Sequence, residues 1–167
     1  MTEMTDPHQS LLSLQEHVSN GTVILKHCPI HQHLLYFDYN PPGEDYSRTY
    51  CLLDEETVIA ILAYTFLPPC NEVPVIQIGY AVNEKSRGTG KAKEIIGLVL
   101  EELQAELDGT DLQSLYVEAV VGIENISSQH VAAKMLSTNP KPCKDALSDS
   151  DALHFRKLLK RANNVAE

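Results

Sequence analysis

The sequence lacks any apolar run long enough to cross a membrane, any secretion-signal pattern at its start and any low-complexity tract. A membrane-spanning helix needs about 20 consecutive apolar residues, and a signal peptide needs a basic start followed by an apolar stretch. These absences predict a soluble protein of the cytoplasm.

Basic residues are few as well. Thirteen Lys and Arg stand against 23 Asp and Glu, which gives a formal net charge of −10. Binding to nucleic acid or to an anionic membrane usually needs a basic surface. We therefore expect neither as a main partner. The acidic balance favours a cationic ligand such as an amine, although solubility alone also accounts for a charge of this sign.

The four cysteines include no C-x-x-C pair and lie far apart at Cys28, Cys51, Cys70 and Cys143. Disulfide frameworks and structural zinc sites usually show closer, paired spacings. We therefore expect reduced thiols, as in a cytoplasmic protein.

One short segment does gather metal-ligand residue types, since His27, Cys28, His31 and His33 fall within seven residues. Pro29 interrupts the local geometry, and no second half of a structural site follows along the chain. Clustered histidines on a loop are commonly just solvated. We predict no metal site.

With 167 residues, 43% of them apolar, the chain is long enough to bury the core of one domain. Residues 1–167 are expected to form that single domain. Apolar periodicity and turn residues predict helices over 7–18, 92–107 and 125–136 and strands over 33–39, 48–53, 57–67, 75–82 and 115–121. Thr138 to Pro142 is expected to be a break.

The segment from 144 to 160 permits two readings. Alternation of Leu153 and Phe155 fits a strand, whereas Ser150 and Asp151 ahead of an apolar run fit a helix.

Residues 75–107 carry the most specific pattern, a buried strand, a turn and a helix. Gly79 within the strand marks a place where a bulge or a ligand could approach. Apolar residues recur every three or four positions along the helix. Glu101, Glu102 and Glu106 are expected on its solvent side.

Basic residues surround the start of this helix, at Lys85, Arg87, Lys91 and Lys93. A helix N-terminus already carries about half a positive charge and should repel cations. An anion would resolve the conflict. Because glycines at 88 and 90 let a ligand approach the backbone, we interpret residues 87–92 as a phosphate cradle.

Two familiar phosphate-binding patterns do not fit this cradle. A nucleoside-triphosphate P-loop needs Gly where the chain has Lys85 and Ser or Thr where it has Ala92. A dinucleotide fingerprint needs Gly or Ala where Lys93 stands.

A third pattern does fit: Arg or Gln, two residues, Gly, one residue, Gly or Ala. Arg87, Gly90 and Ala92 satisfy it between a strand and a helix. A second motif follows from Asn125 to Lys134, reading Asn-x-x-Ser-x-x-Val-x-x-Lys. Together, over about residues 75–136, the two motifs resemble the GNAT superfamily of acyl-coenzyme A-dependent N-acyltransferases, in the version found in ribosomal-protein and related N-acetyltransferases.

The resemblance implies a mixed α/β (α+β) fold. Its sheet would be mostly antiparallel, with six to seven strands flanked by helices, and would open between two parallel strands at 75–82 and 115–121. It favours a closing strand within 144–160. The cofactor core would be 75–136, and residues 6–45 would form the substrate side.

It also implies an enzyme, an acetyl-coenzyme A-dependent N-acetyltransferase of the acyltransferase class. Acetyl-CoA would be the cosubstrate, a small-molecule or peptide amine the acceptor, and transfer would occur by direct attack. A homodimer is possible. The alternative is a non-catalytic module of the same fold that binds coenzyme A.

The cofactor contacts follow from the same resemblance. Backbone groups of Ala81 and Val82 would hold the pantetheine arm and polarise the thioester carbonyl. Asn125 and Ser128 would order the arm. The diphosphate would lie on the cradle residues Arg87, Gly88, Thr89, Gly90, Lys91 and Ala92.

The catalytic base is expected to be Glu118, acting directly or through water if its side chain faces the cleft. Many relatives carry a Glu at the position of Gln77, and Gln cannot accept a proton at neutral pH.

For the acid that protonates the leaving thiolate, relatives often use a Tyr where this chain has Ala132. Ser128 is the expected substitute, with Tyr80 and Tyr116 in reserve. A Ser in the first turn of a helix often satisfies only backbone groups.

Overall fold

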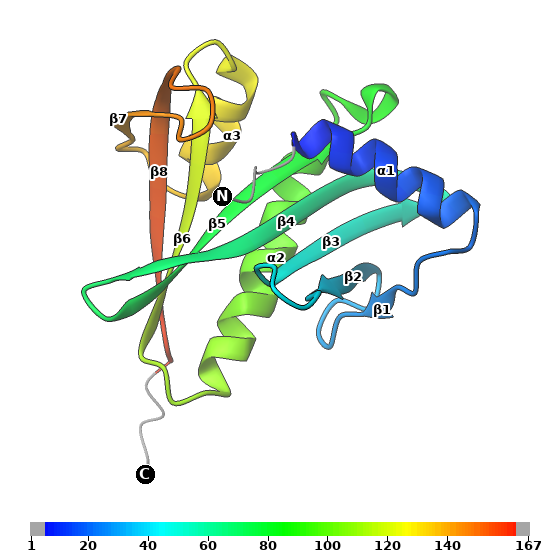
Figure 1. Cartoon of the computed structure of the whole chain (residues 1–167), viewed down its shortest axis with the longest axis horizontal. Coiled ribbons are helices and arrows are strands. Elements are labelled where there is room, and N and C mark those ends of the chain that lie inside the picture. Colours follow the sequence, from blue (N-terminus) through cyan, green and yellow to red (C-terminus); the bar gives the residue numbers. More distant parts are fainter. Residues whose placement is uncertain (1–5, 163–167) are drawn as a thin grey trace.

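The computed structural model describes residues 6–162, which form one eight-stranded sheet with helices on both faces (Figure 1). The strands lie in the order β1-β2-β3-β4-β5-β6-β8-β7. The helices are α1 (Pro7–Ser19), α2 (Lys91–Asp108) and α3 (Ile126–Met135), with a short 3-10 turn η1 (Glu84–Ser86). The strands are β1 (Lys26–His27), β2 (Leu34–Tyr39), β3 (Ser47–Asp54), β4 (Thr57–Cys70), β5 (Val73–Val82), β6 (Ser114–Gly122), β7 (Lys141–Lys144) and β8 (Asp151–Lys160).

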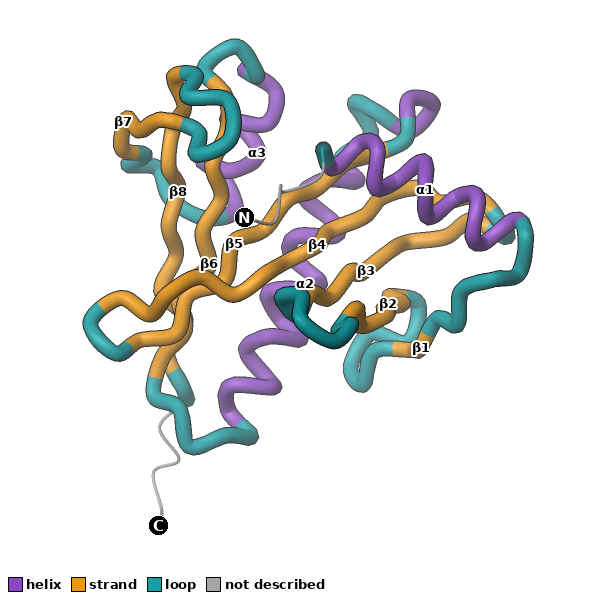
Figure 2. Tube along the Cα trace, viewed as in Figure 1, coloured by secondary structure: helices purple, strands orange, loops and turns teal. Residues whose placement is uncertain are grey.

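Two cores form, one on each face of the sheet. Helices α2 and α3 cover one face, and the apolar stripe of α2 packs there on the sheet residues of the larger core. Leu11 and Leu14 of α1 pack on the opposite face, against Cys51, Val58 and Ile61. The sheet is therefore the middle layer between α1 and the α2–α3 pair, and Figure 2 shows the three helices around it.

The pairing between β5 and β6 decides where the site lies. These are the parallel strands, and they pair over only three residue pairs, Val75–Tyr116, Ile76–Val117 and Gln77–Glu118. Beyond Gln77, β5 continues to Val82 beside β4, while β6 continues to Gly122 beside β8. The two strands therefore part toward their C-terminal ends, as Figure 1 shows.

The predicted fold class is confirmed, a mixed and mostly antiparallel sheet with one parallel pair. Residues Asp151–Lys160 form a strand, not a helix. The sheet has eight strands, more than the six to seven expected, because the short strands β1 and β7 add an edge on each side. The expected break at 138–142 overlaps β7, whose Pro142 is tolerated at a sheet edge because an edge strand can leave backbone groups unpaired.

The prediction that Glu102 lies on the solvent side of α2 is wrong. Its side chain is buried, with 2% of the residue exposed. Its Oε1 accepts hydrogen bonds from the backbone N–H of Ile30 at 3.1 Å and of His31 at 2.7 Å. The burial of this charge is offset by two charge-assisted hydrogen bonds, which hold the loop between β1 and β2 against the helix.

Gly79 lies directly against α1. No bulge occurs there; a Cβ placed at Gly79 would lie 3.1 Å from Cγ of Pro7 in the first turn of α1. The missing side chain lets α1 seat directly on β5, and Asp6 caps this end of the helix by accepting from the His8 N–H at 3.0 Å.

Replacing Gly79 with Ala should therefore destabilise the protein by about 1–3 kcal/mol, because the added methyl crowds Pro7. The matched control is Gly97→Ala in α2, where the nearest atom is the flexible Met135 Cε at 3.5 Å. That change should be neutral or stabilising by up to about 1 kcal/mol, since Ala favours a helix interior over Gly. Urea unfolding measures both, and equal effects would contradict tight seating of α1.

Candidate functional site

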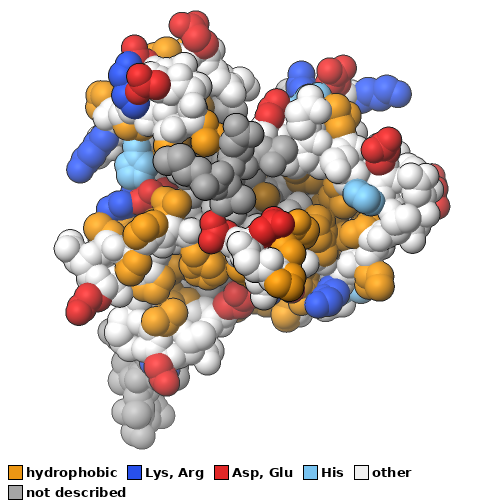
Figure 3. Space-filling view, viewed as in Figure 1, with side chains coloured by type: hydrophobic (Ala, Val, Ile, Leu, Met, Phe, Trp, Pro, Cys, Tyr) orange, Lys and Arg blue, Asp and Glu red, His pale blue; other side chains and the backbone are white. Residues whose placement is uncertain are grey.

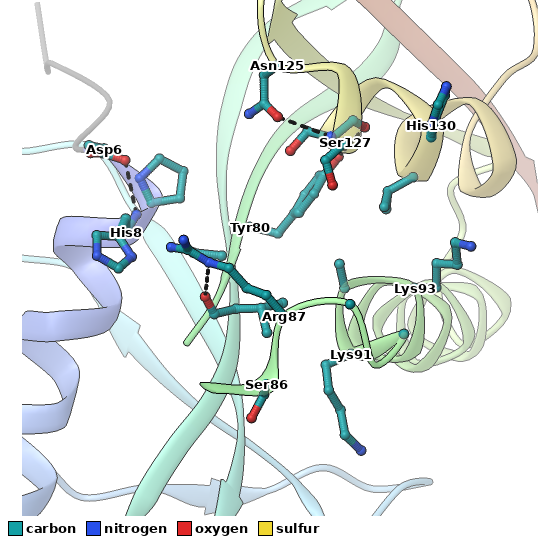
Figure 4. Close-up of a pocket in the computed structure, with 18 residues that line it drawn as sticks. Asp6, His8, Tyr80, Ser86, Arg87, Lys91, Lys93, Asn125, Ser127 and His130 are labelled. Atoms are coloured by element: carbon teal, nitrogen blue, oxygen red, sulfur yellow. Dashed lines mark hydrogen bonds between the residues drawn. The ribbon is translucent and has the colours of Figure 1, made fainter. Parts of the chain in front are cut away.

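A cleft of about 660 Å³ lies at the C-terminal end of β5. One wall is the first turn of α1, and the others are the turn ahead of α2 and the beginning of α3 (Figure 4). Tyr80, Ala81 and Val82 line it from β5, on the stretch that has parted from β6. The cleft is thus a direct result of the opening in the sheet.

The turn into α2 contains two glycines, which leave its backbone accessible to this cleft. Gly88 and Gly90 have φ of 74° and 82°, a left-handed conformation that L side chains rarely adopt. Gly90 is the N-cap of α2 and supplies no side-chain cap. The first N–H groups of the helix therefore have no side-chain acceptor at the N-cap, an arrangement that suits an anion.

Basic side chains stand beside these amides. Arg87 lines the cleft, and its Nε lies 3.5 Å from the Val82 carbonyl oxygen. Lys91 and Lys93 line it from the first turn of α2, where Lys91 pairs with Glu94 at 2.6 Å. The positive charge predicted from the sequence is present at the helix start.

The beginning of α3 faces the cradle. Asn125 caps this helix, accepting from the Ser128 N–H at 3.1 Å. The Tyr80 hydroxyl donates to the Ser128 carbonyl oxygen at 3.0 Å, so β5 is tied to α3 across the cleft. Burial raises the pKa of Tyr80 to about 12, and its hydrogen bond to Ser128 offsets part of that rise. The phenol is therefore protonated at neutral pH and is a proton donor.

The structure brings the predicted cofactor residues together, with one exception. All of them except Thr89 line the cleft. The Thr89 hydroxyl instead donates to the Ser86 carbonyl oxygen, within the turn itself. Ser128, the expected acid, and Tyr80, one of its two reserves, lie beside each other. Tyr116, the other reserve, does not line the cleft.

Some lining residues were not singled out in the sequence. Asp6, Pro7 and His8 reach the cleft from the start of α1, within the region 6–45 expected on the substrate side, and His130 reaches it from α3. The Nδ1 atom of His8 is buried without a hydrogen-bond partner among the described residues. Their residue types carry no motif. Their position depends on how α1 and α3 pack, so no local signal could have identified them.

Glu118 does not line this cleft. Its side chain lies on the sheet face that carries α1, since it pairs with Gln77, whose side chain shares the face of Gly79 two residues further. Its Oε1 accepts from Arg156 Nε at 2.6 Å and also contacts Arg156 Nη2, and its Oε2 lies 3.0 Å from His154 Nε2. The expected base is thus at the point where the strands part, with both oxygens engaged.

The histidine-rich segment is dispersed in the structure. His31 Nε2 lies 2.6 Å from Glu101 Oε2, and His27 Nδ1 lies 2.6 Å from the Gln32 carbonyl oxygen. Burial, together with nearby Glu102, raises the pKa of the Cys28 thiol to about 12, which disfavours the thiolate that binds metal. Within residues 6–162, no group of three or more His, Cys, Asp or Glu is arranged to hold a metal ion.

In the view of Figure 3, acidic and basic side chains are interspersed, and hydrophobic side chains gather over the sheet beside α1. No helix in the described part of the chain is long and apolar enough to span a membrane.

The arrangement of the sheet and the helices is similar to that of solved GNAT acetyltransferases. A GNAT-family acetyltransferase from Streptococcus pneumoniae matches with a TM-score of 0.51 and 14% identity, over 70% of this chain and 69% of that one. A chimera of the spermidine N-acetyltransferase SpeG of Vibrio cholerae with hSSAT matches with a TM-score of 0.52 and 14% identity, over 68% of this chain and 69% of that one. The predicted resemblance is confirmed at the level of the fold.

Comparisons of sequence alone add nothing to this likeness. No protein-family model matches the chain, and no curated protein matches it significantly.

Removal of the Tyr80 hydroxyl should alter how stability depends on pH. An ordinary tyrosine ionises near pH 10.0, whereas Tyr80 in the folded protein ionises at about 12. Its stabilising contribution is therefore complete below about pH 10 and is lost as the pH rises toward 12. Tyr80→Phe should be less stable than wild type by about 1 kcal/mol or more at neutral pH, and the difference should shrink above about pH 10.

Unfolding by urea at a series of pH values measures this difference, and the other tyrosines cancel because both proteins contain them. A difference that stays constant from about pH 8 to 12 would show that the Tyr80 hydroxyl is not buried against Ser128.

Proposed function

We propose that the protein is an N-acetyltransferase that moves the acetyl group of acetyl-CoA to a primary amine. One observation carries the proposal: both sequence motifs meet in one cleft, at the end of the strand that parts from its parallel neighbour. The fold of GNAT acetyltransferases around that cleft supports it.

The cofactor would enter along this cleft. Its diphosphate would lie on the backbone amides of residues 88–92, with Arg87 and Lys91 supplying charge. The pantetheine arm would follow β5, where backbone groups beyond Gln77 have no partner on β6. An N–H group of this strand, near Val82, would polarise the thioester carbonyl. Asn125 and Ser128 would bound the arm from α3.

The reaction requires that the amine lose a proton. An alkyl amine with a pKa near 10 is about 99.9% protonated at neutral pH, which costs roughly 4 kcal/mol in available nucleophile. The free amine attacks the carbonyl carbon, the oxyanion is held by backbone N–H, and the C–S bond breaks to release the thiolate of coenzyme A. No covalent intermediate on the protein is required.

The proton donors and acceptors would come from both sides of the opening. Ser128 or its neighbour Tyr80 would protonate the thiolate, since both lie on the cleft and the Tyr80 phenol is protonated at neutral pH. Glu118 is the buried acidic group at the pair where the strands part, and it would assist removal of the proton from the amine through a relay.

The acceptor is proposed to be a small molecule or a peptide with a primary amine. The net charge of −10 favours a cationic acceptor over an anionic one.

The proposed location is the cytoplasm. All four cysteines are free in the structure, which fits a reducing compartment.

Replacing Gly90 with Asp should abolish or weaken acetyl-CoA binding by at least about tenfold, because a carboxylate would stand where the diphosphate is expected. Asp at this position also strains a backbone with a φ of 82°, so the control must share that strain. The matched control is Gly43→Asp, which has the same φ of 82° and equally open surroundings in a distant loop. Isothermal titration calorimetry with acetyl-CoA compares both with wild type.

A thiol-release assay over a panel of amines then tests turnover. Binding that both variants lose equally, or that neither loses, would contradict the cradle. Binding that only Gly90→Asp loses, without thiol release on any amine, would favour a coenzyme A-binding module over an enzyme.

A further inference from the structure

Where β5 and β6 part, the two faces of β6 carry different side chains. On the α2–α3 face, Val117, Ala119 and Val121 of β6 are buried in the larger core. The opposite face of β6 carries Tyr116, Glu118 and Val120. An amine that approaches an acyl group held between the two strands over this second face would meet these side chains.

A polar cluster occupies that face. Glu118 pairs with Arg156 of β8, and His154 stands opposite Val120, two residues further along the parted stretch of β6. The guanidinium of Arg156 stacks over the Tyr116 ring at 4.5 Å and engages Oε1 of Glu118 through Nε and Nη2. Arg156 thus fixes the Glu118 carboxylate in one orientation.

The second carboxylate oxygen of Glu118 determines the tautomer of His154. His154 Nε2 lies 3.0 Å from Oε2 of Glu118. An ionised carboxylate only accepts hydrogen bonds, so Nε2 must carry the hydrogen. In the neutral ring, the lone pair is then on Nδ1. The side chain of Glu118 is 6% exposed and that of His154 is 22% exposed, so the imidazole is the more accessible of the two.

We propose that His154, rather than Glu118 itself, takes the proton from the acceptor amine. This deepens the proposed function and rests on it. The ammonium N–H bond breaks and its proton moves to Nδ1 of His154, directly or through one water. The freed lone pair attacks the thioester carbonyl, the C–S bond breaks, and the departing thiolate gains a proton from Tyr80 or Ser128, which is replaced by the second proton lost from the nitrogen. The imidazolium returns its proton to solvent. Glu118 is a positioning residue that fixes the tautomer and stabilises the imidazolium, and Arg156 holds Glu118.

Three charged groups face His154 and set its environment. Glu118 and Arg156 are on the two strands of the cluster, and Lys141 stands directly opposite on β7. Lys141 is exposed to solvent, whereas the Glu118 carboxylate is in contact with the ring. The carboxylate is therefore the closer and less screened charge.

Two acceptor amines of nearly equal size can distinguish a role of His154 in proton removal from a purely structural role. Ethylamine is protonated at neutral pH, like other alkyl amines, whereas the fluorines of 2,2,2-trifluoroethylamine leave that amine uncharged. His154→Gln should lower kcat/KM for ethylamine by about 100-fold, within the usual range for acid–base catalysis. It should lower kcat/KM for trifluoroethylamine less than about threefold, because that amine needs no base before attack.

Glu118→Gln should also lower kcat/KM for ethylamine more than kcat/KM for trifluoroethylamine. The loss for ethylamine should be smaller than with His154→Gln, about tenfold. Lys160→Gln is the control, an exposed residue at the end of β8, and should change neither rate. Calorimetric titration with acetyl-CoA verifies that each variant is folded and loaded, and His154→Asn replaces His154→Gln if that variant does not fold.

Equal losses on both amines, or no loss on either, would overturn the role of His154. A wild type that binds acetyl-CoA but releases no coenzyme A with either amine would also overturn it, since no transfer would then need a base. Absence of acetyl-CoA binding in the wild type would instead overturn the proposed function.

Discussion

The short pairing between β5 and β6 is the constraint on which the rest of the structure depends. Three residue pairs join these parallel strands, and beyond Gln77 and Glu118 each follows its other neighbour, β4 or β8. If β5 and β6 stayed paired along their whole length, the backbone N–H and C=O groups of β5 would form hydrogen bonds with β6. Because the sheet opens, those groups face a cleft, and a ligand can satisfy them instead.

Contacts on both faces define the sides of this opening. On one face Pro7 of α1 seats against the bare backbone of Gly79, which brings the first turn of α1 to the mouth of the cleft. On the other face the Tyr80 hydroxyl binds the Ser128 carbonyl at the start of α3. Both contacts attach to the stretch of β5 that has left β6. The cleft is therefore bounded by packed elements, which favours a preformed site.

Much of this could be predicted from the chain because its signals are local. The spacing of Arg87, Gly90 and Ala92 between a strand and a helix predicted the cradle, and the structure places these residues on one cleft. Left-handed glycines and helix caps depend on a few neighbouring residues. The errors arose where distant segments meet: Glu102 was assigned to solvent, yet it is buried against a loop about 70 residues away in sequence.

The sequence by itself determined the helices, most of the strands and the turn that can hold a phosphate, since periodicity and turn chemistry act over short distances. Only the tertiary structure decided what surrounds the turn. It brought His8 and His130 to the cleft, chose a strand for Asp151–Lys160, and thereby set Arg156 and His154 against Glu118. Residues separated by 36 and 38 positions meet there because β8 pairs with β6, and strand pairing between distant segments leaves no local trace in sequence.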